Sequence, residues 1–350
     1  MMHDRQTGND CHLRLEGISR RFGNVKALDD VSLGVGRGAL VCLVGHSGCG
    51  KSSLLRIVAG IDRPDEGRVL LDGREVSGSG GHVEPEDRNI GFMFQDYALF
   101  PHLNVTDNIL FGLRRIGRRA ARERCAAIVA RLGLDHLARR FPHMLSGGEQ
   151  QRVALARALA PQPDIVLMDE PFSNLDRELR NGIRTETIDI LRELGTTVIM
   201  VTHDPEEALS TGDVIVLMRN GKIVQSASGA EIYEHPASPY AAEFFCSFNK
   251  IRTVCRNGCA ETPLGRFAAP GFAEGEHATV YIRPQCLRVN DAEGVDCTVV
   301  DCALFGEIEQ MHVAVAALSE PLRIRSTRRS RLSKGDSTRL AISPEQILIF

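Results

Sequence analysis

The sequence predicts an α/β domain with a largely parallel sheet over residues 1–240, followed by a small β-barrel or sandwich over residues 241–350. Three observations support this prediction. Up to about residue 240, apolar runs of strand length alternate with longer helical patterns. A glycine-rich loop joins one of these runs to a helix. Beyond residue 240 the apolar runs become short and alternating, and Gly, Pro and Asp turns separate them.

The strands expected in the first domain are continuous apolar runs that end near polar or glycine residues: Ala39–Val44, Ile165–Asp169, Thr197–Thr202 and Val214–Arg219. Between about residues 101 and 160 the pattern is almost wholly helical, which predicts a helical subdomain that interrupts the sheet order. The strands expected in the second domain are Thr279–Arg283, Cys297–Val300, Met311–Val315, Leu322–Arg325 and Thr338–Ile342. Pro236 and Pro239 are expected to interrupt regular structure at the boundary.

Composition excludes several classes of protein. The chain has 42 Lys and Arg against 45 Asp and Glu, and this near-neutral balance argues against binding nucleic acid through bulk charge. No apolar run approaches the roughly 18 residues that span a bilayer, and the first residues lack the apolar core of a secretory signal. The ten cysteines lack the spacing of a zinc ribbon and suit reduced thiols. We therefore expect a cytosolic protein that reaches a membrane only through a partner.

The glycine-rich loop is Gly45-His46-Ser47-Gly48-Cys49-Gly50-Lys51-Ser52, which matches G-x-x-x-x-G-K-[ST] between a strand and a helix. Glycines allow backbone N–H groups to wrap the phosphates, and the helix N-terminus adds a positive dipole end. Lys51 supplies a point charge to the β/γ oxygens, and the Ser52 hydroxyl is a ligand for Mg²⁺. A plain strand–loop–helix turn is the alternative. The context favours a nucleoside triphosphate site that extends to Ser53.

An acidic pair ends the apolar run Ile165–Asp169. Asp169 is placed to hold the Mg²⁺ shell, and Glu170 is placed to orient and deprotonate the attacking water. A helix cap or a solvated turn would be the better explanation of two adjacent carboxylates if they stood alone. Beside a phosphate-binding loop, the catalytic interpretation is favoured.

A second anion-binding device occurs in Leu145-Ser146-Gly147-Gly148-Glu149-Gln150-Gln151-Arg152. Ser146 and Glu149 have the spacing of a capping box, and two glycines stand at the start of the helix that follows. The phosphate-binding loop already supplies γ-phosphate ligands, so a single triphosphate site does not need this second loop from the same monomer. We therefore expect this loop to close over the nucleotide of another copy of the chain.

At this point the chain resembles the ATP-binding subunits of ATP-binding-cassette (ABC) transporters, and the resemblance covers essentially its full length. It implies a P-loop NTPase cassette with a helical subdomain and a small OB-like regulatory β-barrel. The motifs occur in the family's order: Phe22 as the aromatic that stacks on adenine, Gly45–Ser52 as Walker A, Gln95 as the Q-loop glutamine, Ser146-Gly147-Gly148 as the signature loop, Asp169-Glu170 as Walker B, Ser173-Asn174-Leu175-Asp176 as the D-loop, and His203 as the switch histidine.

The resemblance implies roles for these residues. Lys51, Glu170 and His203 are the expected catalytic residues. Ser52, Gln95 and Asp169 are the expected Mg²⁺ ligands. Phe22, Gln95 and the loop from Gly45 to Ser53 are expected to bind ATP, while Ser146, Gly147, Gly148 and Asp176 are expected to bind the ATP of the other protomer. Phe22 as a core aromatic, Gln95 as a solvated loop residue and His203 as a structural histidine are the simpler alternatives.

The implied partners are a second copy of the chain, in a homodimer, and an integral membrane permease that docks near Gln95–Thr106. A periplasmic solute-binding protein acts indirectly, and no nucleic acid is expected. The segment Tyr281-Ile282-Arg283-Pro284-Gln285 resembles a recurrent sequence in importer regulatory domains. We therefore expect a peripheral protein on the cytoplasmic face of the inner membrane. Runs such as Asp169–Asp176 are most similar to ferric-iron (Fe³⁺) importer ATPases, and polyamine, sulfate and sugar importers are the alternatives.

Two other classes stay open. A soluble cassette ATPase of DNA repair or translation would show a second cassette, a coiled-coil insertion or a strongly basic surface, none of which the sequence contains. A small-molecule kinase would use the same phosphate-binding loop but would not need Ser146–Gly148 or the β-rich tail.

Overall fold

The computed structural model describes residues 11–290, 294–343 and 347–350. The chain forms two compact units that divide between Ile232 and Tyr233. We call residues 1–232 the N-terminal unit and residues 233–350 the C-terminal unit, and each is described separately.

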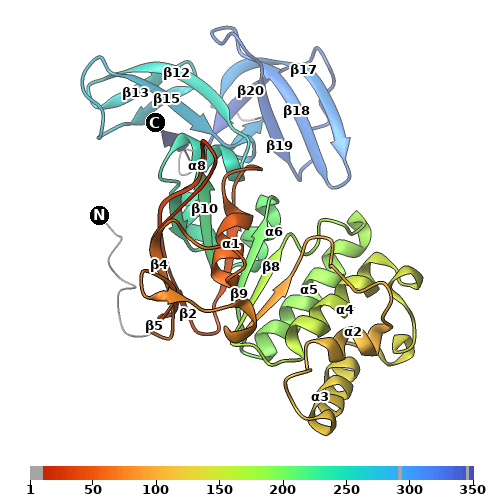
Figure 1. Cartoon of the computed structure of the whole chain (residues 1–350). Coiled ribbons are helices and arrows are strands. Elements are labelled where there is room, and N and C mark those ends of the chain that lie inside the picture. The colour runs from red at the N-terminus through yellow and green to blue at the C-terminus, as the bar shows by residue number, and fades with distance from the viewer. Residues whose placement is uncertain (1–10, 291–293, 344–346) are drawn as a thin grey trace. The chain divides into compact units, whose positions relative to one another are not determined.

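The core of the N-terminal unit is a six-stranded sheet in the order β11-β10-β3-β9-β8-β7 (Figure 1). Strand β11 is antiparallel to β10, and the other neighbours are parallel. Every residue of β3 and β9 is buried, as expected for strands covered on both faces. The bounds are β3 Leu40–Val44, β7 Ile90–Met93, β8 Ile165–Asp169, β9 Thr197–Thr202, β10 Val214–Arg219 and β11 Lys222–Ala227. Three predicted strands have the expected bounds, and the run expected from Ala39 begins at Leu40.

A second, antiparallel sheet of the N-terminal unit was not among the strands predicted from the sequence. Its order is β2-β1-β4-β5-β6. The pairing of β1 with β2 contains repeated register shifts, and such bulges break the period-two alternation by which a half-buried strand is recognised. The bounds are β1 Cys11–Phe22, β2 Val25–Gly36, β4 Glu66–Leu71, β5 Arg74–Gly78 and β6 Gly81–His82.

Helices α2, α3 and α4 form one group beside α5 in the N-terminal unit (Figure 1). The helices of this unit are α1 Lys51–Ala59, α2 Val105–Phe111, α3 Arg118–Arg131, α4 Gly147–Leu159, α5 Arg177–Glu193 and α6 Pro205–Thr211, with 3-10 turns at Pro85–Asp87, Asp135–Leu137 and Pro142–Met144. Helix α7, Gly229–Glu234, contains the point at which the two units divide. Over the described residues of both units, no helix has the length and apolar character needed to cross a bilayer.

The C-terminal unit contains two five-stranded antiparallel sheets, ordered β14-β13-β12-β15-β21 and β16-β20-β17-β18-β19. The side chain of Asn249 ties the sheets together, because its amide donates to Arg323 O at 2.8 Å and accepts from Arg323 N at 2.7 Å. The strands are β12 Asn249–Arg256, β13 Cys259–Thr262, β14 Gly265–Ala268, β15 His277–Ile282, β16 Leu287–Val289, β17 Val295–Phe305, β18 Ile308–Ala314, β19 Leu322–Ser326, β20 Ser337–Ile342 and β21 Ile347–Ile349. A 3-10 turn spans Pro284–Cys286.

The expectation that two prolines would only interrupt structure near residue 240 was wrong in part. Pro239 is the first residue of helix α8, Pro239–Phe245, whose N-cap is Ser238. Proline suits this position because its missing N–H would have no partner in the first turn of a helix.

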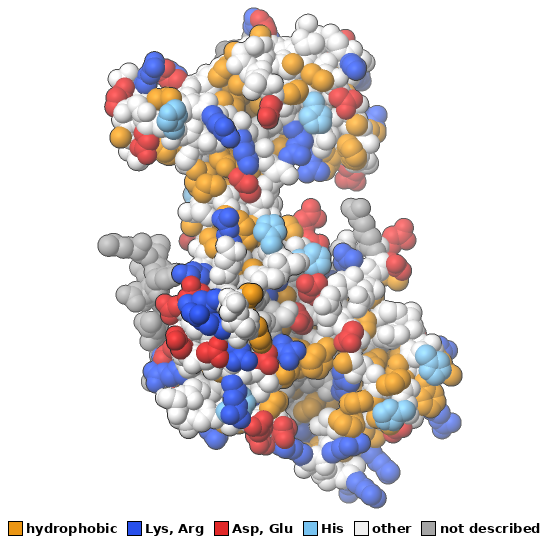
Figure 2. Space-filling model, turned by 45° about the horizontal axis from the view of Figure 1, so that its top comes forward, with side chains coloured by type: hydrophobic (Ala, Val, Ile, Leu, Met, Phe, Trp, Pro, Cys, Tyr) orange, Lys and Arg blue, Asp and Glu red, His pale blue; other side chains and the backbone are white. Residues whose placement is uncertain are grey.

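None of the ten cysteines, all of which lie in the described part of the chain, forms a disulfide, and six of them are buried. Burial raises the pKa of Cys42, Cys125 and Cys286 above the ordinary thiol value, so these side chains behave as small apolar core residues. No group of three or more potential metal-binding side chains occurs in the part of the chain that the structure describes. On the face drawn in Figure 2, basic and acidic side chains are interspersed with hydrophobic ones.

Candidate nucleotide site

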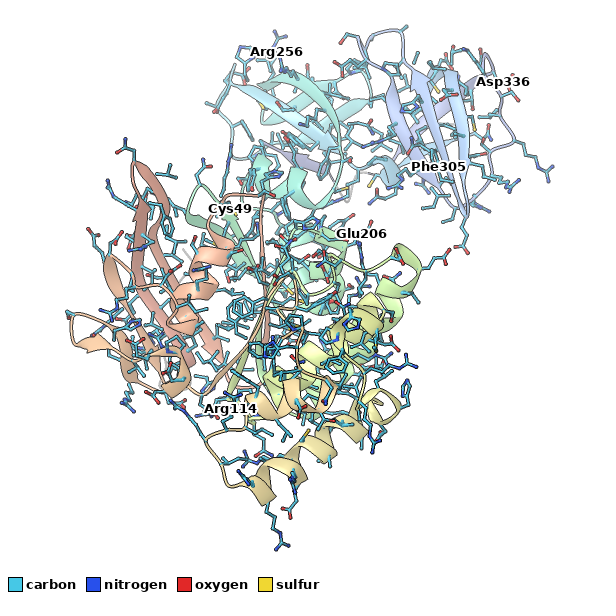
Figure 3. All side chains as sticks on the ribbon, turned by 45° about the vertical axis from the view of Figure 1, so that its right-hand side comes forward. Cys49, Arg114, Glu206, Arg256, Phe305 and Asp336 are labelled. Carbon is cyan, nitrogen blue, oxygen red and sulfur yellow. The ribbon has the colours of Figure 1, made fainter. Side chains whose placement is uncertain are left out.

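The phosphate-binding loop connects the buried strand β3 to helix α1. Gly45, Gly48 and Gly50 all have positive φ angles, of 148°, 80° and 105°, a region that L side chains rarely adopt. A Cβ at Gly45 would lie 2.4 Å from Met218 O, and one at Gly50 would lie 2.3 Å from Ala27 O. The glycines are therefore needed both for the turn of the loop and for its packing against β10 and β2. Figure 3 labels Cys49 in this loop.

Lys51 begins helix α1 and is 5% exposed. Its ammonium donates to Gly45 O at 2.8 Å and to His46 O at 3.1 Å, and it lies 3.7 Å from the Cys49 sulfur. The Lys51 ammonium therefore lies against the backbone of the loop whose bound phosphates it is expected to contact. His46, Ser47 and Gly48 are exposed at the outer side of the loop.

Ser52 and Asp169, which are 117 positions apart, meet across the site. The Ser52 hydroxyl donates to Asp169 Oδ1 at 3.0 Å. Burial raises the pKa of the Asp169 carboxyl, the Ser52 hydrogen bond opposes that effect, and the charge of Glu170 adds to it. A hydroxyl and a carboxylate at this distance are the hard oxygen donors that Mg²⁺ prefers, so these two residues fit the metal predicted from the sequence.

Glu170 follows β8 with an unusual backbone angle, φ 46°. Its N–H donates to Val201 O at 3.1 Å, which ties it to strand β9. Its Oε2 lies 2.9 Å from His203 Nδ1. The switch histidine is therefore placed beside the expected general base, and the exposed side chain of His203 leaves the other ring nitrogen accessible.

Phe22 is the last residue of β1, at the hairpin that leads into β2. Its side chain is 46% exposed, so the alternative of a core aromatic is wrong. The Arg20 guanidinium carbon lies 4.9 Å from the Phe22 ring centroid. The same hairpin reaches the phosphate-binding loop through Ala27, whose carbonyl lies against Gly50. An exposed aromatic ring on the hairpin that contacts the loop suits stacking on a planar base.

The Q-loop and the D-loop contact each other in the same chain. Asn174 Nδ2 donates to the backbone carbonyl of Gln95 at 2.8 Å, and the Ser173 hydroxyl donates to Glu170 O at 2.9 Å. The Gln95 side chain is exposed, and within the described residues no hydrogen bond joins it to Ser52 or Asp169. Asp176 is an exposed residue at the N-cap of α5. The backbone carbonyl of Gln95 therefore contacts the D-loop. Its side-chain amide is not brought to Ser52 or Asp169.

Ser146 caps helix α4 through the capping box read from the sequence. Its N–H and hydroxyl donate to Glu149 Oε2 at 2.7 and 2.8 Å, and these hydrogen bonds hold the pKa of Glu149 below its ordinary value. Gly147 lies beside the D-loop, where an added Cβ would be 3.6 Å from Asn174 O. Among the described residues no hydrogen bond or ion pair links Ser146–Gly148 to the phosphate-binding loop.

Sequence reasoning missed Arg88, which holds the far end of helix α1. The buried guanidinium donates to Ile57 O at 3.0 Å, Val58 O at 2.9 Å and Val76 O at 3.0 Å, and its burial lowers its pKa to about 10. Arg88 thereby fastens the helix of the phosphate-binding loop to the antiparallel sheet. A lone arginine in a loop carries no sequence signal for this role.

Sequence reasoning also missed the contacts of Arg157. This side chain donates to two backbone carbonyls of the Q-loop turn, Tyr97 O at 2.8 Å and Ala98 O at 2.7 Å. A signal was available, because Arg157 interrupts an apolar run on a helix that is otherwise buried there.

Comparisons with known proteins agree with this geometry. Residues 28–173 match the family model "ABC transporter", and residues 280–350 match the model "TOBE domain". A Fe(3+) ions import ATP-binding protein from Streptomyces coelicolor is 45% identical over 306 residues, which are 87% of this chain and 86% of that protein. A sulfate/thiosulfate import ATP-binding protein from Chromobacterium violaceum is 43% identical over 286 residues, which are 81% of this chain and 77% of that protein.

Two solved structures share the fold of the N-terminal unit. The structure of cbiO1 from Clostridium perfringens, part of the ABC transporter complex cbiONQ, has a TM-score of 0.59 at 28% identity and covers 64% of this chain and 90% of that one. A dimeric post-hydrolysis structure of the ATP-binding cassette MJ0796, bound to ADP and Pi, has a TM-score of 0.54 at 31% identity and covers 62% and 98%. These matches confirm the predicted cassette with a β-rich C-terminal domain. The chain therefore belongs to the family of ABC transporter import ATP-binding proteins.

Proposed function

We propose that this chain is the ATP-hydrolysing subunit of a ferric-iron importer, and that it works as a homodimer on the cytoplasmic face of the inner membrane. In this proposal each protomer binds ATP between its own Gly45–Ser53 loop and the Ser146–Gly148 loop of the partner copy. A membrane permease docks on the segment Gln95–Thr106, and a periplasmic binding protein delivers the solute. We further propose that residues 1–240 form the ATPase domain and residues 241–350 the regulatory domain.

The observation that carries the proposal is the position of Glu170. Its carboxylate contacts His203 at 2.9 Å and follows directly on Asp169, which accepts from Ser52. Glu170 acts as the general base that orients and deprotonates water, and His203 braces the γ-phosphate. Lys51 and the loop N–H groups stabilise the charge that develops on the phosphate oxygens. Mg²⁺, when held by Ser52 and Asp169, neutralises charge on the β- and γ-phosphates.

In this proposal each ATP is bound by both protomers, and its hydrolysis is therefore coupled to the association of the two protomers. ATP bound between two copies favours the closed pair, and cleavage of the γ-phosphate removes the group that both protomers hold. The cycle is then a population shift driven by a ligand, and the docking segment transmits it to the permease. ATPase activity in this scheme needs water and no other acceptor, which separates it from a kinase.

Ferric iron is proposed as the solute because Fe(3+) import proteins occur at 45% and 42% identity among the relatives. Sulfate is the second candidate, because a sulfate/thiosulfate import protein from Synechocystis is 46% identical over 272 residues. The identity values therefore favour neither solute strongly, and transport has to be measured.

Uptake of radiolabelled ferric iron and sulfate, with spermidine and maltose as further substrates, in a strain that lacks the gene tests the proposal. We expect iron uptake to fall and to return with the wild-type gene but not with Glu170→Gln. Loss of sulfate uptake alone would replace iron by sulfate. Normal uptake of every substrate, together with normal ATPase activity of the purified chain, would overturn the importer proposal.

A further inference from the structure

The turn that opens the docking segment, which we define as Gln95–Thr106, has a strained backbone. Tyr97 and Ala98 are consecutive residues with φ angles of 62° and 44°. This left-handed region is unfavourable for any residue with a Cβ, and two such residues in succession are more unfavourable still. Contacts from elsewhere in the structure must therefore hold this turn in place.

Arg157 makes those contacts from helix α4. Its two terminal nitrogens donate to the carbonyls of Tyr97 and Ala98 at 2.8 and 2.7 Å. The planar fork of a guanidinium suits two neighbouring acceptors, and hydrogen bonds from a cation are stronger than neutral ones. Burial lowers the pKa of Arg157, and the charge of the Asp96 carboxylate opposes this effect, but within the described residues no carboxylate lies close enough to form an ion pair with it. The guanidinium is therefore committed to the turn.

The turn is continuous with the rest of the docking segment. The Phe100 ring lies 5.5 Å from the Arg157 guanidinium and 4.3 Å from the Phe111 ring. The fully buried Asn108 side chain accepts from Phe100 N at 2.8 Å and donates to Phe100 O and Leu103 O at 3.1 and 2.9 Å. A displacement of the turn is thus passed directly to the residues that follow it, including the exposed Pro101 and His102.

Helix α4 connects this turn to the signature loop. It begins at Gly147, directly after Ser146, and reaches Arg157 within the same uninterrupted helix. A helix of this length moves as a rigid rod, with a rise of about 1.5 Å per residue. Any tilt of α4 caused by contact between Ser146–Gly148 and the partner's nucleotide therefore moves the guanidinium of Arg157.

We propose that Arg157 is a positioning residue that transmits the closure of the ATP-bound dimer from the signature helix to the permease-docking segment, by holding the left-handed turn at Tyr97 and Ala98. This inference rests on the proposed function. It adds the specific side chain, and the two carbonyls, through which the signature loop acts on the segment that faces the permease.

The test uses the full-length chain with Arg157→Gln and the double variant Arg157→Gln/Ala98→Gly. Glycine adopts positive φ without a steric penalty, so it should partly replace the arginine at the turn. The matched control is Arg131→Gln, which removes an exposed arginine of the same helical group that pairs with Glu193 at 2.8 Å. Uptake in the deletion strain, ATP binding and ATP-dependent pairing of the purified protein are measured for each variant.

We expect Arg157→Gln to reduce uptake about tenfold or more, as the loss of two charge-assisted hydrogen bonds allows, while ATP binding and pairing stay within about twofold of the wild type. Ala98→Gly should restore most of the lost uptake, and Arg131→Gln should behave as the wild type. Normal uptake in Arg157→Gln overturns the inference. So does a double variant that regains thermal stability without regaining uptake, because the loss of uptake would then not come from the turn at Tyr97 and Ala98.

Amide hydrogen exchange separates this inference from the proposed function. The amide of Leu103 is hydrogen-bonded within the segment, to Phe100 O, and the amide of Phe100 is hydrogen-bonded to Asn108 Oδ1 in helix α2. Arg157→Gln should lower their protection and Ala98→Gly should return it, whether or not the wild type imports iron or sulfate. Unchanged protection overturns the inference. If Arg157→Gln does not fold, Arg157→Lys, which keeps the charge without the fork, replaces it, and the same outcomes apply.

Discussion

His203 Nδ1 lies 2.9 Å from Glu170 Oε2 although the two residues are 33 positions apart. Strands β8 and β9 are parallel neighbours in which Asp169 is paired with Val201, so the residues that follow them emerge at the same edge of the sheet. This edge is where ligands bind in open α/β sheets. The pairing explains how the residues proposed as general base and as γ-phosphate contact, which follow two different strands, come to lie side by side.

We expect Glu170→Gln to bind ATP normally and to lose about 10²- to 10⁴-fold in turnover, because the amide cannot accept the proton of the attacking water. Phosphate release measures turnover, and size-exclusion chromatography with ATP should show an accumulated dimer. Glu206→Gln is the control, since Glu206 is an exposed carboxylate on the neighbouring helix α6. Wild-type turnover in Glu170→Gln would remove Glu170 from its proposed role.

Gly147→Ala separates the fold of the monomer from the contact with a second copy. The new Cβ would lie 3.6 Å from Asn174 O and from Leu175 Cδ2, which is ordinary contact, and alanine favours a helix over glycine by about 1 kcal/mol. We expect an unchanged or raised melting temperature together with loss of ATPase activity and of ATP-dependent pairing. Full activity would contradict the shared site.

Gly148→Ala is the companion variant. Its Cβ would lie 2.5 Å from Ile183 Cδ1, so this variant should also lower the free energy of unfolding by about 1–3 kcal/mol. The comparison of the two glycines distinguishes a packing defect from a lost nucleotide contact.

Asp169→Asn should stabilise the nucleotide-free protein while abolishing Mg²⁺-dependent ATPase activity. Burial raises the pKa of Asp169 from 3.8, so its ionised form is disfavoured in the folded state, and the Ser52 hydroxyl can still donate to an amide oxygen. The expected gain is about 0.5–2 kcal/mol at neutral pH. Because the folded pKa is raised, the gain should decrease as the pH falls through the folded pKa and should be absent below 3.8. Thermal unfolding across this range measures it, and a less stable variant at pH 7 would contradict the prediction.

Glu149→Gln should destabilise the start of helix α4, with the opposite dependence on pH. The N–H and hydroxyl of Ser146 lower the pKa of Glu149 below 4.5, so the carboxylate contributes stability above that value and loses it as the pH falls through the folded pKa. We expect a loss of about 0.5–2 kcal/mol at pH 7. Urea unfolding of both proteins at pH 7 and at about pH 4 should show the difference shrinking, and a constant difference would argue for another cause.

Phe22→Ala should weaken ATP binding by about 1–3 kcal/mol, the usual value of one aromatic stacking partner, without changing stability. Val25→Ala is the matched control, because Val25 is 66% exposed on the same hairpin. Equilibrium titration with a fluorescent ATP analogue measures both variants. Equal affinities in the two would show that Phe22 does not contact the base.

Features that depend on contiguous residues could be predicted from the sequence. The loop Gly45–Ser52, the capping box at Ser146 and the buried strand Ile165–Asp169 have the expected local structure, because glycine conformation, capping and continuous apolar runs act over a few neighbouring residues. The order of such segments also identified the family. The antiparallel sheet escaped prediction because its bulged strands lack a regular alternation.

Only the tertiary structure decided which distant groups meet. Ser52 reaches Asp169, Asn174 reaches the carbonyl of Gln95, and Arg157 reaches the carbonyls of Tyr97 and Ala98. These contacts depend on strand order and helix packing, which no local pattern encodes. Every residue also has a backbone carbonyl. The residue types of Tyr97 and Ala98 therefore do not indicate that Arg157 donates to their carbonyls.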